Sequence, residues 1–226
     1  MPAAPIALAC WLLPSAVVIG CYLLSLQLGQ VRSCVPFFEG CVSISAAARQ
    51  DPSIHLFRAV ILPASTMIAG YWLLVHAWLA GLGERGSSRS WITGLGVIGA
   101  LFLVLYAVFL GTDGRAYGLM RRYGVTVYFA FTALAQLLLA ARLHKLPGAA
   151  KARLGRGVVG PKIAFTAAML ALGLVNIPAA NFFAVFRIEN VIEWNFALLM
   201  HGYFALTAIA WHRADYRISA SQRFGI

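Results

Sequence analysis

The stretch Cys34–Arg58, which reads CVPFFEGCVSISAAARQDPSIHLFR, joins two apolar runs of membrane-spanning length. It gathers cysteines, serines, acidic residues, a histidine and arginines, whereas the runs on either side are almost purely apolar. A helix of roughly 20 apolar residues is long enough to cross the hydrocarbon core of a bilayer. The alternation of such runs with short polar breaks therefore indicates that the chain folds in a membrane.

The composition agrees with this interpretation. Hydrophobic residues make up 61% of the 226 residues and charged residues only 11%, far below the roughly 25% charged share of a soluble domain. The formal net charge of +11 would suit nucleic acid, but the basic residues lie between apolar runs and no nucleic-acid motif accompanies them. Phospholipid headgroups are therefore the predicted anionic neighbours, and no nucleic-acid partner is expected.

The apolar runs predict an all-α, polytopic membrane protein with six transmembrane helices in one bundle. Residues 1–226 form a single domain, because no repeat or low-complexity tract divides the chain. The predicted helices cover about 6–28, 57–82, 91–110, 123–143, 163–186 and 192–211.

The basic residues in the breaks predict the orientation of the bundle. Eleven lysines and arginines fall on one side: Arg85, Arg89, Arg142, Lys145, Lys151, Arg153, Arg156, Lys162, Arg213, Arg217 and Arg223. Seven fall on the other: Arg32, Arg49, Arg58, Arg115, Arg121, Arg122 and Arg187. This bias predicts that both termini are cytoplasmic and that the Cys34–Arg58 stretch faces outward. The membrane would be the plasma (inner) membrane of a bacterium, or a secretory-pathway or lysosomal membrane of a eukaryote.

Two of the four cysteines, Cys34 and Cys41, share the outward loop. In an oxidising compartment they would form a local disulfide, and the alternative is a pair of free, buried thiols. Cys10 and Cys21 lie inside the first apolar run. No cysteine has C-x-x-C spacing or a nearby histidine, so neither a metal nor a cofactor is predicted.

One polar stripe is predicted on the second helix. Arg58, Ser65, Trp72 and His76 follow one another at spacings of seven, seven and four, which places them on one helical face. That face is expected to contact other helices, because a charged side chain pointing into lipid costs ~2.5 kcal/mol or more.

A second face, on the third helix, consists of small residues. It is formed by Gly94, Gly96, Gly99 and Ala100. Small residues let two helix backbones approach closely within a membrane.

Ionisable side chains gather in the outer half of this predicted topology. Arginines suit phosphate, and carboxylates suit hydroxyls or amines, so the outer mouth of the bundle is a predicted lipid-headgroup site. The predicted ligand-binding residues are Arg58, Asp113, Arg115, Glu189, Glu193 and His201. Each charged group has the alternative of lying solvated at the membrane surface.

Two other functions stay open at this point. A serine, a histidine and a carboxylate can form a hydrolytic or acyl-transfer site, and the catalytic candidates are Ser43, Ser45, His55 and His201. No Gly-x-Ser-x-Gly turn supports them. The third alternative is a scaffold that binds another membrane protein through its small-residue faces and carries no ligand.

Two motifs carry a family resemblance. The run VSISAAARQDPSIHLFRAVILPAS, with Ser43, Ser45, Ala46, Pro52, Phe57 and Arg58, resembles the first outward loop and second helix of the Frag1/DRAM/Sfk1 family. The run EWNFALLMHGYFALTAIAW resembles the sixth helix of that family, which carries the pattern onto Glu193, Trp194 and His201. The chain departs from the pattern at Val42, where the family has proline, and at Asp113 and Arg115, where a histidine is expected. The resemblance implies a six-helix protein of lipid remodelling or lipid distribution.

Overall fold

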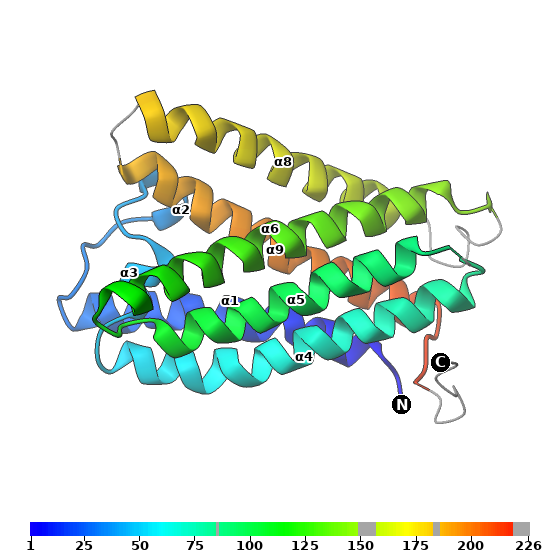
Figure 1. Cartoon of the computed structure of the whole chain (residues 1–226), viewed down its shortest axis with the longest axis horizontal. Coiled ribbons are helices and arrows are strands. Elements are labelled where there is room, and N and C mark those ends of the chain that lie inside the picture. Colours follow the sequence, from blue (N-terminus) through cyan, green and yellow to red (C-terminus); the bar gives the residue numbers. More distant parts are fainter. Residues whose placement is uncertain (85, 149–156, 183–185, 219–226) are drawn as a thin grey trace.

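The computed structural model describes residues 1–84, 86–148, 157–182 and 186–218 (Figure 1). Within these ranges the chain is helical, and its one extended pairing is an isolated bridge between Pro2 and Arg217. Two short helices, α2 (Pro36–Glu39) and α3 (Ile44–Ala48), lie between the first two long ones. The long helices are α1 (Ala4–Gln27), α4 (Ser53–Gly81), α5 (Ser88–Phe109), α6 (Arg115–Lys145), α8 (Val159–Phe182) and α9 (Phe186–Arg213).

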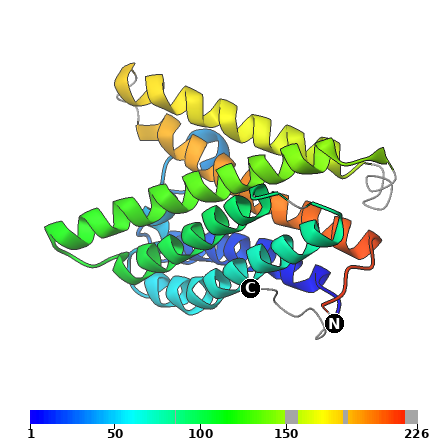
Figure 2. The same cartoon turned by 45° about the vertical axis from the view of Figure 1, so that its right-hand side comes forward.

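These long helices form a closed ring (Figures 1 and 2). Helix α1 packs between α4 and α9, α5 follows α4, α6 follows α5, and α8 lies between α6 and α9. Helices α2 and α3 pack at one end, against α1 and α9. Residues 1–3 pair with residues 216–218 at the opposite end, where the backbone N–H of Ala3 donates to the carbonyl of Tyr216 at 3.0 Å.

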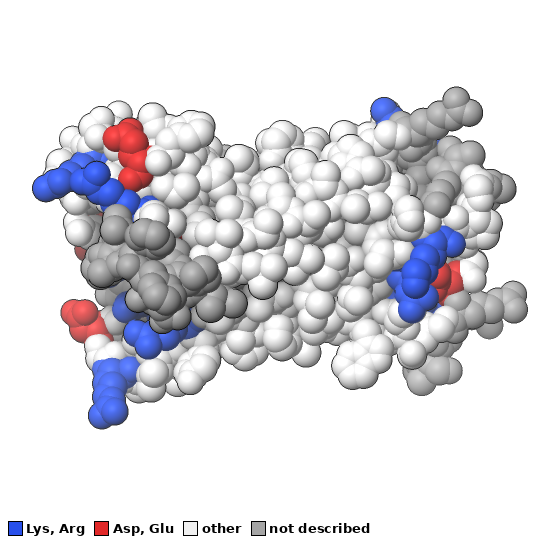
Figure 3. Space-filling model, turned by 90° about the horizontal axis from the view of Figure 1, so that it is seen from above, with Lys and Arg blue, Asp and Glu red and all other residues white. Residues whose placement is uncertain are grey.

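Apolar helices and segregated charges make this a helical membrane protein. Helices α1, α4, α5 and α6 are long and apolar enough to cross a bilayer, and the described apolar part of α8 is the shorter Val159–Val175. In the space-filling view the lysines, arginines and acidic residues lie at the two ends, with an uncharged belt between them (Figure 3). Such a belt is the expected surface of a protein in contact with lipid tails.

Helix α6 begins earlier than the sequence predicts, at Arg115 instead of about residue 123. Glycine is unfavourable inside a helix, so Gly118 and Gly124 favour a loop in the segment 111–124. The residues between them, however, are mostly good helix formers. Gly124 is buried because it lies against the backbone of Tyr106, so it marks a close contact between α6 and α5. Part of the charge pattern used for the orientation lies outside the described residues, at Arg85, Lys151, Arg153, Arg156 and Arg223, and so do residues 183–185 of the predicted fifth helix.

The predicted disulfide between Cys34 and Cys41 is confirmed. Three side chains of α9 hold the segment around this disulfide in place. Each donates to a backbone carbonyl at 2.8 Å: Asn195 to Phe37, Asn190 to Gly40 and Trp194 to Val42. The loop is therefore a fixed cap over one end of the ring.

The polar stripe of α4 contacts another helix, as predicted, and the helix that Trp72 and His76 meet is α5. Trp72 is fully buried and lies over Gly96, where an added Cβ would overlap its indole ring. His76 Nδ1 lies 3.3 Å from the hydroxyl of Thr93 on α5. The stripe thus joins α4 to α5 along most of their length.

Candidate functional site

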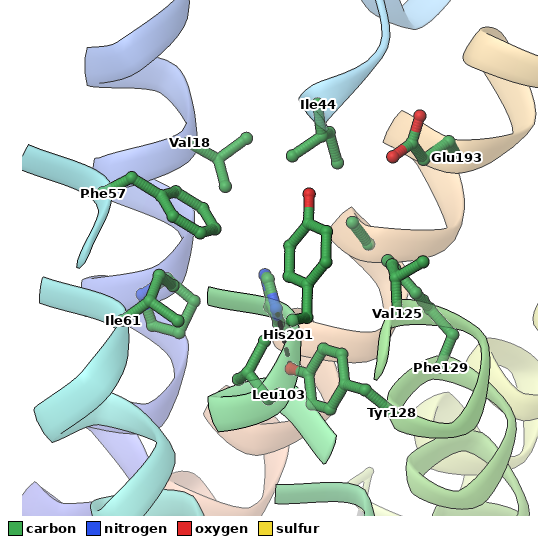
Figure 4. A pocket seen from close by; sticks show the side chains of 13 residues that line it. Val18, Ile44, Phe57, Ile61, Leu103, Val125, Tyr128, Phe129, Glu193 and His201 are labelled. Carbon is green, nitrogen blue, oxygen red and sulfur yellow. Dashed lines mark hydrogen bonds between the residues drawn. The ribbon is translucent and has the colours of Figure 1, made fainter. Parts of the chain in front are cut away.

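A narrow apolar pocket lies inside the ring, in the half that carries the loop (Figure 4). Its cavity volume is ≈ 30 Å³, room for roughly one or two water molecules. Ile44 of α3 points into it from the loop, while Glu193 and His201 approach from α9 (Figure 4). Its remaining walls come from Ala197 of α9 and from α1, α4, α5 and α6. The residues of these four helices are Pro14, Val18, Phe57, Ile61, Leu103, Tyr106, Val125, Tyr128 and Phe129.

The hydroxyl of Tyr106 is a buried polar group in the wall of this pocket. Tyr106 is 4% exposed, and within the described residues its hydroxyl makes no hydrogen bond of standard geometry. It lies next to Ser45 and within electrostatic range of Glu193, Arg49 and Arg121. A buried hydroxyl without a well-formed hydrogen bond is unfavourable, so this group is available to a polar atom that enters the pocket.

Ser45 lies beside that hydroxyl on the loop side, and Arg49 and Glu193 are within electrostatic range of it. Arg49 donates to the hydroxyl of Ser45 at 3.2 Å and to its carbonyl at 3.1 Å. Glu193 interacts with the backbone N–H of Ile44, in the first turn of α3. An arginine and a serine therefore lie near the tyrosine and the carboxylate that line the loop end of an otherwise apolar pocket.

His201 lies deeper and is 6% exposed. Its Nδ1 is 3.4 Å from the hydroxyl of Ser15 on α1, and its Nε2 is 3.3 Å from the hydroxyl of Tyr128 on α6. Glu193 precedes His201 by two steps of four residues on the same helix, so the two lie ~12 Å apart along the axis at 1.5 Å per residue. A polar chain thus crosses the ring from α1 to α6 at the base of the pocket.

A second crevice lies between α1 and α9 and shares His201 with the central pocket. Its other walls include Ser15, Ile19, Phe37 and Leu198, and Ile19 and Leu198 are exposed on the sides of their helices. His201 therefore separates the interior of the ring from a crevice that reaches the lateral surface of the bundle.

Arg58, a predicted headgroup ligand, binds the end of α5. Its Nε donates to the carbonyl of Ala107 at 3.1 Å, and its Nη2 donates to the carbonyls of Val108 at 3.0 Å and Leu110 at 2.7 Å. The last carbonyls of a helix lack intrahelical partners and carry partial negative charge. Arg58 supplies both the donors and the positive charge that this helix end needs.

Replacing Arg58 by glutamine is expected to lower the free energy of unfolding by about 2 kcal/mol, because charge-assisted hydrogen bonds are lost at a half-buried position. Arg58→Lys should lose nearly as much, since an ammonium group cannot reproduce the planar fork of donors. Thermal unfolding in one defined detergent measures both. Wild-type stability in Arg58→Gln would contradict the capping role.

Three of the other predicted ligand-binding residues lie at the surface. Asp113 and Arg115 are exposed where α6 begins, and Glu189 is exposed in the first turn of α9. Of the predicted ligand-binding set, Glu193 and His201 line the central pocket. The sequence did not single out Tyr106, Ser15 or Tyr128.

The catalytic candidates of the loop do not meet a histidine within the part of the chain that the structure describes. Ser43 caps α3 by accepting from the backbone N–H of Ala46 at 3.1 Å, and Ser45 contacts Ser43 and Arg49. His55 forms an exposed pair with Asp51 at 2.9 Å. Among the described residues no three histidine, cysteine or acidic side chains gather as metal ligands do.

Comparisons of the chain with family models, with curated proteins and with solved structures give no match. The function must therefore be argued from the site itself.

Proposed function

We propose that this protein is a six-span membrane protein that binds the headgroup of a membrane lipid at the loop end of its helical ring. There it assists the remodelling of lipids or their distribution between leaflets, as the resemblance to the Frag1/DRAM/Sfk1 family implies. The buried hydroxyl of Tyr106 carries this proposal, because it makes no hydrogen bond of standard geometry within the described residues and lies beside Ser45, within electrostatic range of Arg49 and Glu193.

The chemistry of the mouth fits an amphiphile. Arg49 suits a phosphate, while Glu193 and Tyr106 suit a hydroxyl, an amine or a phosphate oxygen. Below them the wall is almost entirely apolar, and beside it the crevice between α1 and α9 opens to the lateral surface. An acyl chain can follow that path while its headgroup stays at the mouth. Because the cavity is narrow, entry requires the side chains around Ile44 to move.

The proposed topology has all six long helices in the bilayer and both termini in the cytoplasm. Helices α8 and α9 have 24 and 28 residues, long enough at 1.5 Å per residue to cross about 30 Å of hydrocarbon, and they complete the ring with α1 and α6. The disulfide at the loop end supports an outward loop, because such bonds persist in oxidising compartments.

Tyr106→Phe tests the proposal. Removing an unsatisfied buried hydroxyl should leave the empty protein as stable as the wild type or stabilise it by about 1 kcal/mol. The same change should weaken the binding of the co-purifying lipid roughly tenfold, since one hydrogen bond to the headgroup is lost. Native mass spectrometry of the purified protein measures lipid occupancy, and thermal unfolding of delipidated protein measures stability.

The matched control is Tyr128→Phe, which removes a hydroxyl that already has His201 as partner. It should lose stability without the selective loss of lipid. If Tyr106→Phe retains the same lipids at the same occupancy as the wild type, the headgroup site is not where we place it.

One observation favours a second candidate function, a membrane hydrolase or acyltransferase. Ser15 and His201 lie 3.4 Å apart and both line the crevice between α1 and α9. In such a site the Ser15 oxygen would attack the carbonyl of a lipid ester while His201 Nδ1 takes the serine proton. The ester C–O bond would then break, the departing alcohol would take that proton from His201, and water or an acceptor alcohol would release the acyl group from Ser15. A fluorophosphonate probe would then label the wild type but not Ser15→Ala, and an unlabelled wild type would count against this function.

A further inference from the structure

Helix α6 carries an arginine at the loop end of the face that lines the central pocket. Val125 and Tyr128 of α6 line that pocket. Arg121 precedes them by four and seven residues, so the three side chains lie along one side of the helix. The helix begins at the end of the ring that carries α3 (Figure 1). Arg121 therefore lies about one turn beyond Val125, on the side of the loop.

The packing of α6 on α5 places Arg121 near the hydroxyl of Tyr106. Gly124, which follows Arg121 by three residues, lies against the backbone of Tyr106, and Arg121 is within electrostatic range of the Tyr106 hydroxyl. Arg121 is half-buried, whereas Arg115 and Arg122 of the same helix are exposed. Arg121 therefore faces the inside of the ring, and the other two arginines face outward.

The turn that precedes α6 contacts the loop at Arg49. A Cβ added at Gly111 would lie 2.8 Å from the backbone carbonyl oxygen of Arg49. The side chain of Arg49 donates two hydrogen bonds to Ser45, and a guanidinium carries more N–H donors than these two bonds use. Two arginines, one from the loop and one from α6, are therefore within electrostatic range of the same buried hydroxyl of Tyr106.

The charge around this hydroxyl is positive. Arg49 and Glu193 have opposite charges and are within electrostatic range of each other, so they offset each other. Arg121 takes part in no ion pair within the part of the chain that the structure describes. One positive charge is therefore left over, and a ligand group with one negative charge would balance it. A phosphodiester has that charge, and its oxygens fit the planar fork of an arginine.

We propose that Arg121 is a phosphate ligand of the headgroup site and that the lipid bound there is a phospholipid. Its phosphodiester would lie between Arg121 and Arg49, with one phosphate oxygen on the hydroxyl of Tyr106. This inference rests on the function proposed above and narrows the ligand, because a lipid without phosphate would leave the charge of Arg121 unbalanced. Arg121 is then the residue that selects phospholipids over phosphate-free lipids.

Arg121→Gln provides the test, and Arg115→Gln is the matched control because it removes the same charge from the same helix. Arg115 is exposed and precedes Gly124 by nine residues, roughly two and a half turns, so it lies on the opposite side of α6 from the contact with α5. Phosphatidylglycerol and diacylglycerol with the same acyl chains are titrated separately into delipidated protein. Native mass spectrometry measures the binding of each lipid.

Arg121→Gln is expected to bind phosphatidylglycerol roughly tenfold more weakly than Arg115→Gln does, because a charge-assisted contact with the phosphate is lost. Its binding of diacylglycerol should equal that of the wild type. Equal binding of phosphatidylglycerol by the two variants would overturn the proposal, and so would an equal loss of both lipids in Arg121→Gln, since the arginine would then only support the fold. Inorganic phosphate that binds the wild type as tightly as phosphatidylglycerol would also overturn it, because the site would then serve the free anion.

Tyr106→Phe, measured in parallel, separates a failure of this inference from a failure of the headgroup site. If Tyr106→Phe weakens the binding of phosphatidylglycerol while Arg121→Gln does not, the headgroup site stands and the role of Arg121 is wrong. If neither variant weakens it, both proposals fail.

Discussion

Replacing Gly96 by leucine is expected to destabilise the bundle by about 3 kcal/mol or more, the upper end of the effects seen when a packed core is overfilled. A single Cβ at Gly96 would already overlap the indole ring of Trp72, which is fully buried between Tyr71 and Phe204. Trp72 therefore has no free space to move into. The three further carbons of leucine would force α4 and α5 apart.

Gly94→Leu separates this overlap from the general effect of a leucine in α5. Gly94 lies two residues away, and a Cβ added there meets no atom within 4 Å. We expect Gly94→Leu to unfold at the wild-type temperature or slightly above it, because leucine favours a helix over glycine by roughly 0.8 kcal/mol. Both variants are compared by thermal unfolding in the same detergent. Equal stability of the two would show that α4 and α5 do not pack as closely as the structure has them.

The helical secondary structure and the position of the charges at the two ends of the bundle could be predicted from the sequence. Both depend only on the composition and on the periodicity of apolar residues. The α4 stripe is one example, since Trp72 and His76 do contact a neighbouring helix, as their spacing predicts. The structure shows which glycines of the small-residue face of α5 lie close to another helix. A Cβ added at Gly96 would meet Trp72 and one added at Gly99 would meet Thr132 of α6, whereas one added at Gly94 meets no atom within 4 Å. Only the order of helices around the ring decides which glycine meets which neighbour.

The candidate site could be predicted less well, for physical reasons. A tyrosine in an apolar run is typical of a packing residue. Nothing in the sequence therefore distinguishes Tyr106, whose hydroxyl makes no hydrogen bond of standard geometry within the described residues, from Tyr203, which donates to the carbonyl of Gln136. Arg58 was predicted to bind a lipid headgroup, but its donors bind backbone carbonyls at the end of α5, a partner that the sequence does not reveal. Lys162 was counted among the surface charges, yet it is fully buried and donates to Thr207 at 2.6 Å.

Gly40→Ala is expected to undock the loop from α9 and to cost about 3 kcal/mol or more. Gly40 has φ +60, a left-handed conformation that costs an L-residue roughly 1–2 kcal/mol. A Cβ there would also overlap the backbone carbonyl of Arg187 and approach Val191, and a backbone group in the first turn of a helix cannot rotate away as a side chain can. The hydrogen bond from Asn190 to the Gly40 carbonyl would be lost as the loop separates from α9.

The loop positions Ile44 over the pocket, so the same variant should also release the lipid that Tyr106 is proposed to bind. Gly29→Ala is the control, because Gly29 has φ +69 and nothing within 4 Å of an added Cβ. It incurs the conformational cost of roughly 1–2 kcal/mol without the overlap, and it should keep its lipid. Thermal unfolding and lipid occupancy measured on both variants separate the two effects. If Gly40→Ala lost no more stability than Gly29→Ala and kept its lipid, the docked loop would have no part in holding the ligand, and the mouth of the site would have to be sought between the helices instead.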